Sequence, residues 1–487
     1  MKFDLQCSIQ LSKKADELKE ELEAFIKGEE LFSSLESYEL KADRLHLRIV
    51  SDVKRSHEIA LRFYKKFAQF FGKKKIGVRG IHIDRYHISF EVERQPKKAV
   101  SIPFAEVTVD GTLITMTITD KGEEFLRQNY VDRMIRRIRE KIDMQHYEGK
   151  KEYWRAIWQS EEKEPVWNKD PSEEMQRAGW ITLLGKGKWF YFPPAAALMR
   201  AMERIAFQEV VMPLGFKEVI EPMHVSFDTW IKTGHLEGMP GEIYYISEPK
   251  NREAEEWERF VDLLKIQREV DETELLKNLK PPKAGVCYAQ CPNIYTALAG
   301  KTIAKASLPL LLVDRSTPSD RYEAGGKHGI ERVDEFHRIE IVYIGTRDQL
   351  LQLKEKLVER YRHVFENILD LEWRMATVTP FYLQQAGIAG MEEDAVKGTI
   401  DFEVWLPYRG DRSREWLEIQ NISIVGDKYT RAFTIKTQRG DLWSGCSGIG
   451  LERWMVAFLA QKGMDPEHWP DEFRKYVEPF PDMPEFL

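Results

Sequence analysis

Apolar and polar residues alternate along two stretches of the first 150 residues. Leu45, Leu47 and Ile49 alternate with polar residues within 40–53, and Val107 and Val109 do so within 76–118. A period of two is typical of strands that bury one face. Both stretches are therefore predicted to form antiparallel strands.

Helical spacing occurs between and after these strands. Ile59, Phe63 and Phe67 recur every four residues and predict a helix over 56–71. A second apolar stripe predicts a helix over about 121–145 and consists of Val131, Met134, Ile135, Ile138 and Ile142. The first part of the chain is thus predicted to be an α+β domain.

The stretch 151–176 is charged, contains proline and is rich in tryptophan. We interpret it as a helical connector that ends near Pro171, which divides the chain into a domain over 1–165 and a domain over 166–487. The second domain is predicted to hold a helix at about 194–212, a charged insert at 245–282, strands between 308 and 445, and a closing helix after Gly450.

Charge is distributed unevenly. The 487 residues carry a net charge of −7, which excludes a uniformly basic protein that coats nucleic acid. Residues 51–100, however, hold 13 basic and 5 acidic side chains. The amino-terminal part can therefore attract a polyanion, whereas the rest cannot do so by net charge alone.

The cysteine count and the length of the apolar runs indicate the cellular compartment. Four cysteines in 487 residues do not form a disulfide framework, so a reducing, cytoplasmic location is expected. No run reaches the roughly 18 apolar residues of a membrane helix. The first residues contain an early acid and no apolar core, so no signal peptide is expected.

Three segments follow one another in the second domain and hold the candidate chemistry: 197–222, 320–345 and 444–453. Taken alone, each has an ordinary explanation, namely a core helix with an edge strand, a solvated strand face with ion pairs, and a tight packing turn. In the middle segment Phe336, Arg338 and Glu340 share one strand face, and buried charges there are costly unless a ligand pairs with them.

In this order and spacing the segments resemble motifs 1, 2 and 3 of the class II aminoacyl-tRNA synthetases. The motif 2 pattern is filled by Arg321, Glu323, Arg332 and Phe336, and the motif 3 pattern by Gly448, Gly450 and Arg453. The resemblance implies an α+β catalytic domain with an antiparallel sheet flanked by helices, beside an α+β tRNA-binding domain. It also implies a homodimer formed through about 197–222.

The same resemblance implies an ATP site and two catalytic arginines. Arg321 is expected to hold the α-phosphate, Arg453 the γ-phosphate, and Glu323 the adenine, on which Phe336 stacks. Tyr322, Arg332, Val333 and Glu418 complete the expected ATP-binding set, Glu418 through Mg²⁺.

A closer likeness joins the chain to the methanogenic-type, zinc-dependent seryl-tRNA synthetases. It extends over the whole chain and includes KIGVRGI (75–81), TWIKTGH (229–235), CYAQCP (287–292) and LWSGCSGIGLERW (442–454). It implies Zn²⁺ ligation by Cys291, Glu340 and Cys446, with the amino group of serine in the open position. Spacing alone does not indicate this site, because Cys287-x-x-x-Cys291 is not a zinc knuckle and a lone buried cysteine usually belongs to a core.

Serine contacts are implied for Ala289, Arg321, Arg338, Glu340, Gln385, Asn421 and Ser423. Asn421 and Ser423 are candidates to read the serine hydroxyl. Glu418 and Asn421 would face opposite sides of a regular strand, so their joint role requires a bulge or a strand end.

The family resemblance also bears on the basic amino-terminal part. Arg62, Lys65 and Lys66 share one helix face, and Arg79 follows a lysine run. A solvated helix face explains them by composition alone, whereas the resemblance implies that Arg62, Lys65 and Arg79 contact the phosphates of serine tRNA. The sequence contains no sustained heptad repeat, so the long helical arm that ordinary seryl-tRNA synthetases carry for the tRNA is not expected.

The reaction expected is activation of L-serine with ATP, followed by transfer to the 3′ end of serine tRNA. Two alternatives are an amino-acid:carrier-protein ligase, against which the basic amino-terminal domain argues, and a non-catalytic binding paralogue, against which the full set of motif residues argues.

Overall fold

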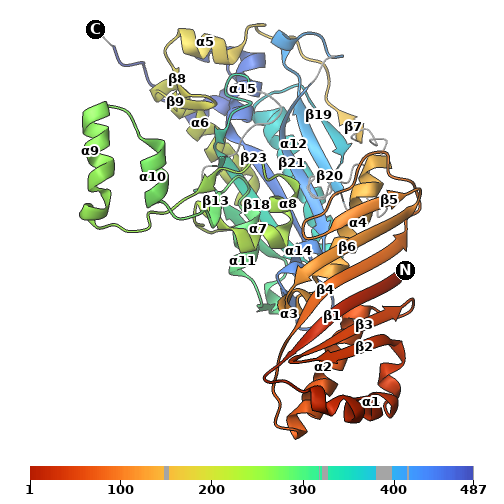
Figure 1. The fold of residues 1–487 in the computed structure, drawn as a ribbon. Helices are drawn as coiled ribbons and strands as arrows, with labels where there is room; N and C mark the ends of the chain where they lie inside the picture. The colour runs from red at the N-terminus through yellow and green to blue at the C-terminus, as the bar shows by residue number, and fades with distance from the viewer. Residues whose placement is uncertain (147–152, 317–318, 321–326, 380–397, 414–415, 486–487) are drawn as a thin grey trace. The chain divides into compact units, whose positions relative to one another are not determined.

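The computed structural model describes residues 1–146, 153–316, 319–320, 327–379, 398–413 and 416–485 (Figure 1). The chain forms two compact units, Met1–Gly149 and Lys150–Leu487. No helix in the described part of the chain is long and apolar enough to cross a membrane. Each unit has its own core and is described separately.

The first unit is a six-stranded antiparallel sheet with helices, as an α+β domain requires. Its strand order is β2-β3-β1-β4-β6-β5. The strands are β1 (Lys2–Leu11), β2 (Leu35–Lys41), β3 (Arg44–Ser51), β4 (Val78–Glu91), β5 (Glu106–Asp110) and β6 (Leu113–Lys121). The α-helices are α1 (Lys19–Lys27), α2 (Ser56–Lys73), α3 (Glu123–Arg127) and α4 (Tyr130–His146).

Three sequence predictions for this unit have different outcomes. The strands and the helix over 56–71 are confirmed, and Ile59, Phe63 and Phe67 are buried. The helix expected over 121–145 is instead two helices, because Asn129 between α3 and α4 takes a positive φ of 55°. The central strand β1 was not predicted, although Phe3, Leu5, Cys7 and Ile9 alternate and are buried.

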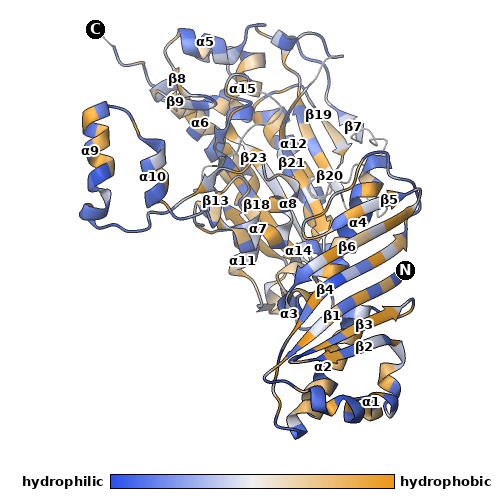
Figure 2. Cartoon of the chain, viewed as in Figure 1, coloured by the Kyte–Doolittle hydropathy of each residue, from blue (hydrophilic) through white to orange (hydrophobic). Residues whose placement is uncertain are grey.

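The second unit is built on an eight-stranded sheet of order β10-β15-β18-β23-β21-β20-β19-β7. All neighbours are antiparallel except β10 and β15. Most of its central strands are hydrophobic (Figure 2). The strands are β7 (Trp154–Gln159), β10 (Lys217–Glu218), β15 (Leu310–Asp314), β18 (Arg338–Gly345), β19 (Trp373–Val378), β20 (Gly398–Val404), β21 (Leu417–Gly426) and β23 (Trp443–Gly450).

Helices and small sheets surround this sheet. The longer helices are α6 (Pro193–Ile205), α9 (Glu258–Gln267), α12 (Arg347–His363) and α15 (Leu451–Lys462). The shorter ones are α5 (Pro171–Arg177), α7 (Phe227–Thr233), α8 (His235–Gly238), α10 (Glu272–Asn278), α11 (Cys291–Ala297), α14 (Lys428–Ala432) and α16 (Asp471–Val477). The remaining strands are β8 (Ile181–Gly185), β9 (Lys188–Tyr191), β11 (His224–Ser226), β12 (Tyr245–Ile246), β13 (Ala284–Val286), β14 (Thr302–Ile303), β16 (Ser319–Asp320), β17 (Glu335–Phe336) and β22 (Lys436–Thr437). Trp373, Phe365 and Trp454 lie in the main core.

The expected helical connector is wrong for residues 154–159. They form β7, which pairs with β19 at the edge of the eight-stranded sheet, and Trp158 packs against Trp373 with ring centroids 4.4 Å apart. Aromatic residues pack well on the pleated surface of a strand, so pairing with β19 makes this segment a strand and not a helix. The division between the compact units accordingly precedes β7, whereas we expected the boundary at 165.

Candidate active site

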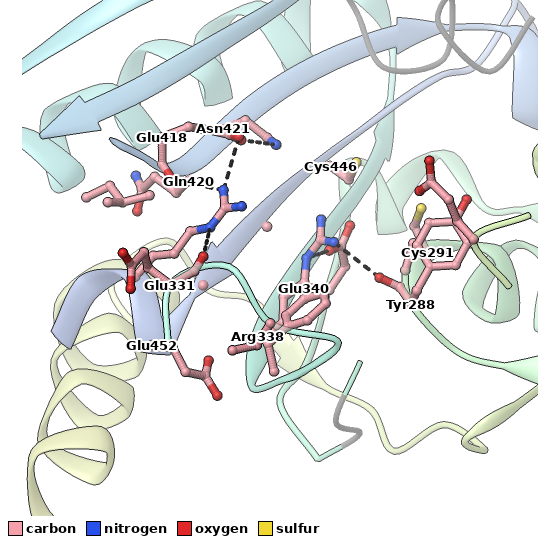
Figure 3. A pocket seen from close by; sticks show the side chains of 18 of the residues that line it. Tyr288, Cys291, Glu331, Arg338, Glu340, Glu418, Gln420, Asn421, Cys446 and Glu452 are labelled. Carbon is pink, nitrogen blue, oxygen red and sulfur yellow. Dashed lines mark hydrogen bonds and ion pairs between the residues drawn. The ribbon is translucent and has the colours of Figure 1, made fainter. Parts of the chain in front are cut away.

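A cavity of about 510 Å³ lies in the second unit, at the face of β18, β21 and β23. Segments far apart in the sequence line it, including 288–291, 330–340, 418–421 and 446–453. In Figure 3 Tyr288 and Cys291 lie on one side of it, and Glu418 and Glu331 lie on the other. The cavity therefore has two chemically different ends.

Two thiols and a carboxylate converge at the first end. Cys291 begins α11, Glu340 lies in β18 and Cys446 lies in β23, and their ligand atoms are all within 4.8 Å of one another. Each residue is at most 2% exposed. The hydrogen bond with Cys446, followed by burial, raises the pKa of the Cys291 thiol, and burial raises that of Glu340. Two ionised thiols and an ionised carboxylate would carry more negative charge than the single neighbouring guanidinium of Arg338 balances.

The donor set fits a metal of the zinc class. Zn²⁺ accepts thiolate and carboxylate ligands, and three protein ligands leave a fourth position open. Nε of Arg338 lies 2.7 Å from Oε2 of Glu340. Even so, neither Glu340 oxygen has a well-aligned hydrogen-bond donor among the described residues, so the carboxylate retains capacity for a metal.

Phe336, Arg338 and Glu340 all line the cavity, as their alternation predicts, although Phe336 ends β17 and the other two lie in β18. On the opposite face Ile339 and Ile341 are fully buried in the core. The alternation of β18 thus presents its charged side chains to the cavity and its apolar ones to the core.

Arg338 fits only because a glycine lies beneath it. A Cβ atom at Gly448 would collide with the guanidinium of Arg338. The guanidinium also donates to the carbonyl of Tyr288 at 3.5 Å. Gly448 thereby allows a charged side chain to lie flat against the sheet.

The bulge that Glu418 and Asn421 require is present in β21. Phe402 pairs with Gln420 and Glu403 pairs with Glu418, so Ile419 is the extra residue. Both side chains consequently line the cavity, and the Asn421 amide donates to Glu418 Oε1 at 3.4 Å.

Arg453 lies near the start of α15 at the second end. Its Nη1 donates to the carbonyl of Glu418 at 2.9 Å and lies 3.2 Å from Glu418 Oε2, while its Nε donates to the carbonyl of Glu331 at 3.1 Å. This holds a cation in place in the wall of the cavity that Val333 and Phe336 also line.

Two carboxylates that we did not predict support this end. Glu331 is buried and accepts hydrogen bonds from His328, Arg409 and Tyr408 at 2.6, 2.7 and 3.1 Å. Burial opposes its ionisation, but the His328 hydrogen bond leaves its pKa below the ordinary value. Glu452, also buried, accepts from the backbone N–H and ring of His337. Both residues neighbour motif positions, but their partners are distant in sequence.

Several expected residues lie elsewhere. Ser423 does not line the cavity, because it is buried in β21 with its hydroxyl 2.8 Å from that of Thr399. Arg332 is half-buried and also lies outside the cavity lining. Arg321, Tyr322, Glu323 and Gln385 fall outside the described residues. Ala289 lines the cavity, as does the unpredicted His235.

In the first unit the three expected tRNA contacts are exposed. Arg62 and Lys65 lie on α2 and Arg79 on β4. None of them forms an ion pair in the part of the chain that the structure describes. Their neighbour Lys66, in contrast, is 3.2 Å from Glu29.

Comparisons with known proteins agree with this geometry. Residues 1–140 match a tRNA-binding domain, and 286–462 match the class II tRNA synthetase core domain for glycine, histidine, proline, serine and threonine. A type-2 serine–tRNA ligase of Methanothrix thermoacetophila is 40% identical over 100% of both chains. Another, of Methanococcoides burtonii, is 44% identical over 89% of this chain and 86% of its own.

Two solved structures are similar. SerRS of M. kandleri, in complex with A. aeolicus tRNASec, superposes with a TM-score of 0.89 at 29% identity, covering 100% of this chain and 99% of that one. A cytoplasmic serine–tRNA ligase of Naegleria fowleri, in complex with AMP, has a TM-score of 0.51 at 14% identity over 73% and 81% of the chains. The second likeness concerns the fold alone.

Proposed function

The chain belongs to the type-2 serine–tRNA ligase family, and we propose that Cys291, Glu340 and Cys446 hold a zinc ion at the serine end of the cavity. The enzyme activates serine with ATP and transfers the seryl group to the 3′ end of serine tRNA. The convergence of two buried thiols and a buried carboxylate carries the zinc proposal. When bound there, zinc supplies a Lewis-acid position that ligates a neutral amino group.

The reaction itself needs no side-chain nucleophile. A serine carboxylate oxygen attacks the α-phosphorus, the bond to pyrophosphate breaks, and seryl-adenylate forms. A ribose hydroxyl of the tRNA end then attacks the carbonyl carbon, and AMP leaves. The protein contributes positioning and charge neutralisation, so Arg321 and Arg453 are the proposed catalytic residues.

The second end of the cavity is the proposed ATP site. Arg453 is already held by Glu418 and by the Glu331 carbonyl, so its charge is oriented before phosphate arrives. Val333 and Phe336 provide an apolar wall for the adenine, and Glu418 a carboxylate for the Mg²⁺ that accompanies ATP. Tyr322, Glu323 and Arg332 complete the proposed set by resemblance.

The first end is the proposed serine site. Arg338 offers a guanidinium to the serine carboxylate, beside Glu340, Ala289 and Asn421 in the cavity wall. Gln385 and Arg321 join this set by resemblance. Ser423 is proposed to support β21 rather than touch serine, because its hydroxyl already bonds with Thr399.

The first unit is the proposed docking surface for tRNA phosphates. Arg62, Lys65 and Arg79 are exposed cations without a protein partner among the described residues, and such contacts supply affinity and register. The match of residues 1–140 to a tRNA-binding domain argues against the carrier-protein ligase alternative.

The homodimer is proposed to form through about 197–222. Met212 and Ile220 in this segment are 58% and 83% exposed, as expected of apolar side chains that a second copy covers.

The zinc proposal is tested by metal analysis of matched cysteine variants. Protein purified without chelator should contain about one zinc per chain, and Cys291→Ser and Cys446→Ser should lose it. Cys287→Ser is the control, because this buried thiol donates to the Ala289 carbonyl at 3.2 Å and is not in the cluster. Less than about half a zinc in the wild type, or equal loss in the control, contradicts the proposal.

A further inference from the structure

His235 is a buried histidine in the wall of the proposed active site. It is the first residue of α8, directly after Gly234, whose φ is 85°. Its side chain is fully buried and lines the same cavity as the Cys/Glu/Cys cluster. Its Nε2 has no hydrogen-bond partner among the described residues. A buried polar atom of this kind needs a partner, which here has to come from the cavity contents.

The hydrogen bonds of Thr233 determine what Nε2 offers. Nδ1 of His235 lies 2.7 Å from the Thr233 hydroxyl, and that hydroxyl donates to the carbonyls of Thr229 and Trp230 at 3.2 and 3.3 Å. With its hydrogen used on the helix, the Thr233 oxygen accepts from Nδ1–H. Nε2 then carries a lone pair. The opposite tautomer would give up the bonds to the helix carbonyls and bury an unsatisfied N–H.

The ring is also neutral. Burial, followed by the positive charges of Lys428 and Arg338, lowers the pKa of His235 to about 3. At physiological pH His235 is therefore a neutral hydrogen-bond acceptor in the cavity wall and not a second cation beside Arg338.

The position of His235 indicates which group of the substrate donates a hydrogen bond to Nε2. Its ring lies 5.4 Å from that of Tyr288, which Figure 3 shows with Cys291 on the side of the cavity away from Glu418 and Glu331. We propose that Nε2 of His235 accepts a hydrogen bond from the side-chain hydroxyl of serine, and so contributes to the selection of serine over alanine. The inference rests on the proposed function, in which the amino group of serine is held by the cysteine cluster and its carboxylate by Arg338.

The consequence is a penalty against substrates without a hydroxyl. Alanine would leave a fully buried acceptor without a donor, whereas serine satisfies it. A buried water could replace the hydroxyl only by filling the space beside the alanine methyl group. His235 is therefore assigned as a specificity-determining residue and takes no proton during the reaction.

The test compares His235→Phe with His235→Gln. Phenylalanine keeps an aromatic ring but no acceptor, while the Gln side-chain oxygen restores one at similar reach. Affinities for non-hydrolysable seryl- and alanyl-adenylate analogues are measured by calorimetry. His235→Phe should bind the seryl analogue about tenfold more weakly, bind the alanyl analogue within about twofold, and leave the KM for ATP unchanged. His235→Gln should recover most of the loss.

Ile243→Val serves as the packing control, because Ile243 lies in the small core that contains Tyr288, the ring neighbour of His235, but does not line the cavity. Its serine-to-alanine ratio should equal that of the wild type. If His235→Phe loses affinity equally for both analogues, or if Ile243→Val changes the serine-to-alanine affinity ratio, the inference is overturned in favour of a packing role. Normal pyrophosphate exchange with slow tRNA charging overturns it in favour of a donor on the tRNA end.

These failures are distinct from failure of the proposed function. If the wild-type enzyme does not exchange pyrophosphate with serine or contains no zinc, the proposed site itself is wrong. If the wild type is active and zinc-loaded but His235→Phe keeps the full serine-to-alanine ratio, only the assignment of His235 is wrong.

Discussion

The guanidinium of Arg338 lies against the backbone of Gly448 on the neighbouring strand, in space that any Cβ atom would occupy. This relationship places the cation of the proposed serine site within the sheet surface. Gly448, a glycine of motif 3, is therefore required for the packing of Arg338, which lies in the motif 2 segment.

Gly448→Ala should displace Arg338 and lower kcat/KM for serine by about a hundredfold, because small misplacement of a binding group has effects of this size. Pyrophosphate exchange measures it. Gly450→Ala is the comparison, since a Cβ there meets only ordinary contacts at 3.6 Å, and a smaller loss is expected. Equal losses would show that collision with Arg338 is not the cause.

Arg453→Lys should raise the KM for ATP about ten- to a hundredfold and change the KM for serine little. Arg453 reaches the Glu331 and Glu418 carbonyls with two different nitrogens, whereas a lysine has a single nitrogen on a flexible stem, so its charge is less well oriented. Steady-state pyrophosphate exchange separates the two constants. A matching rise in the KM for serine would contradict the separation of the two ends.

His337 should make the stability of the catalytic unit depend on pH. Its hydrogen bond with buried Glu452 raises its pKa above 6.5, so its stabilising effect is complete below that value and is lost as pH rises through the folded-state pKa. The melting temperature of His337→Gln should therefore lie furthest below that of the wild type near pH 6 and approach it in alkaline buffer. Exposed His468→Gln is the control, and a pH-independent difference for His337→Gln would refute the linkage.

Reversal of charge at Arg62 and Lys65 should weaken tRNA binding and leave pyrophosphate exchange intact. For every phosphate that the protein no longer neutralises, the slope of log K against log salt concentration should become shallower by about 0.7 to 0.9. Filter binding across a salt series gives both values. Lys27→Glu makes a charge reversal on α1, where Lys27 pairs with Glu23, and should have a smaller effect. A parallel fall in both activities would contradict a docking role.

The sequence was most informative where local periodicity determines the outcome. Alternation correctly placed Phe336, Arg338 and Glu340 on one face, and the requirement for a bulge between Glu418 and Asn421 is met at Ile419. In each case a short stretch of local backbone was sufficient, although Phe336 ends β17 and Arg338 begins β18.

Prediction was weakest where residues distant in the sequence determine a residue's environment. Residues 154–159 are a strand because β19 pairs with them, and Glu331 is a buried carboxylate because Arg409 and Tyr408 reach it. Ser423 could not be separated from Asn421 by sequence, since its partner Thr399 lies on another strand. His235 ends the TWIKTGH segment, but only the arrangement of Thr233 and Tyr288 reveals its acceptor.

The pairing of β7 with β19 decides where the two units can be separated. A catalytic fragment that began at residue 166 would lack β7 and leave the backbone N–H and C=O groups of β19 along an open edge. It would also uncover Trp373, which is fully buried against Trp158 in the intact chain. An unpaired apolar edge recruits strands from other molecules, so such a fragment should aggregate, and a soluble catalytic unit should begin before Tyr153.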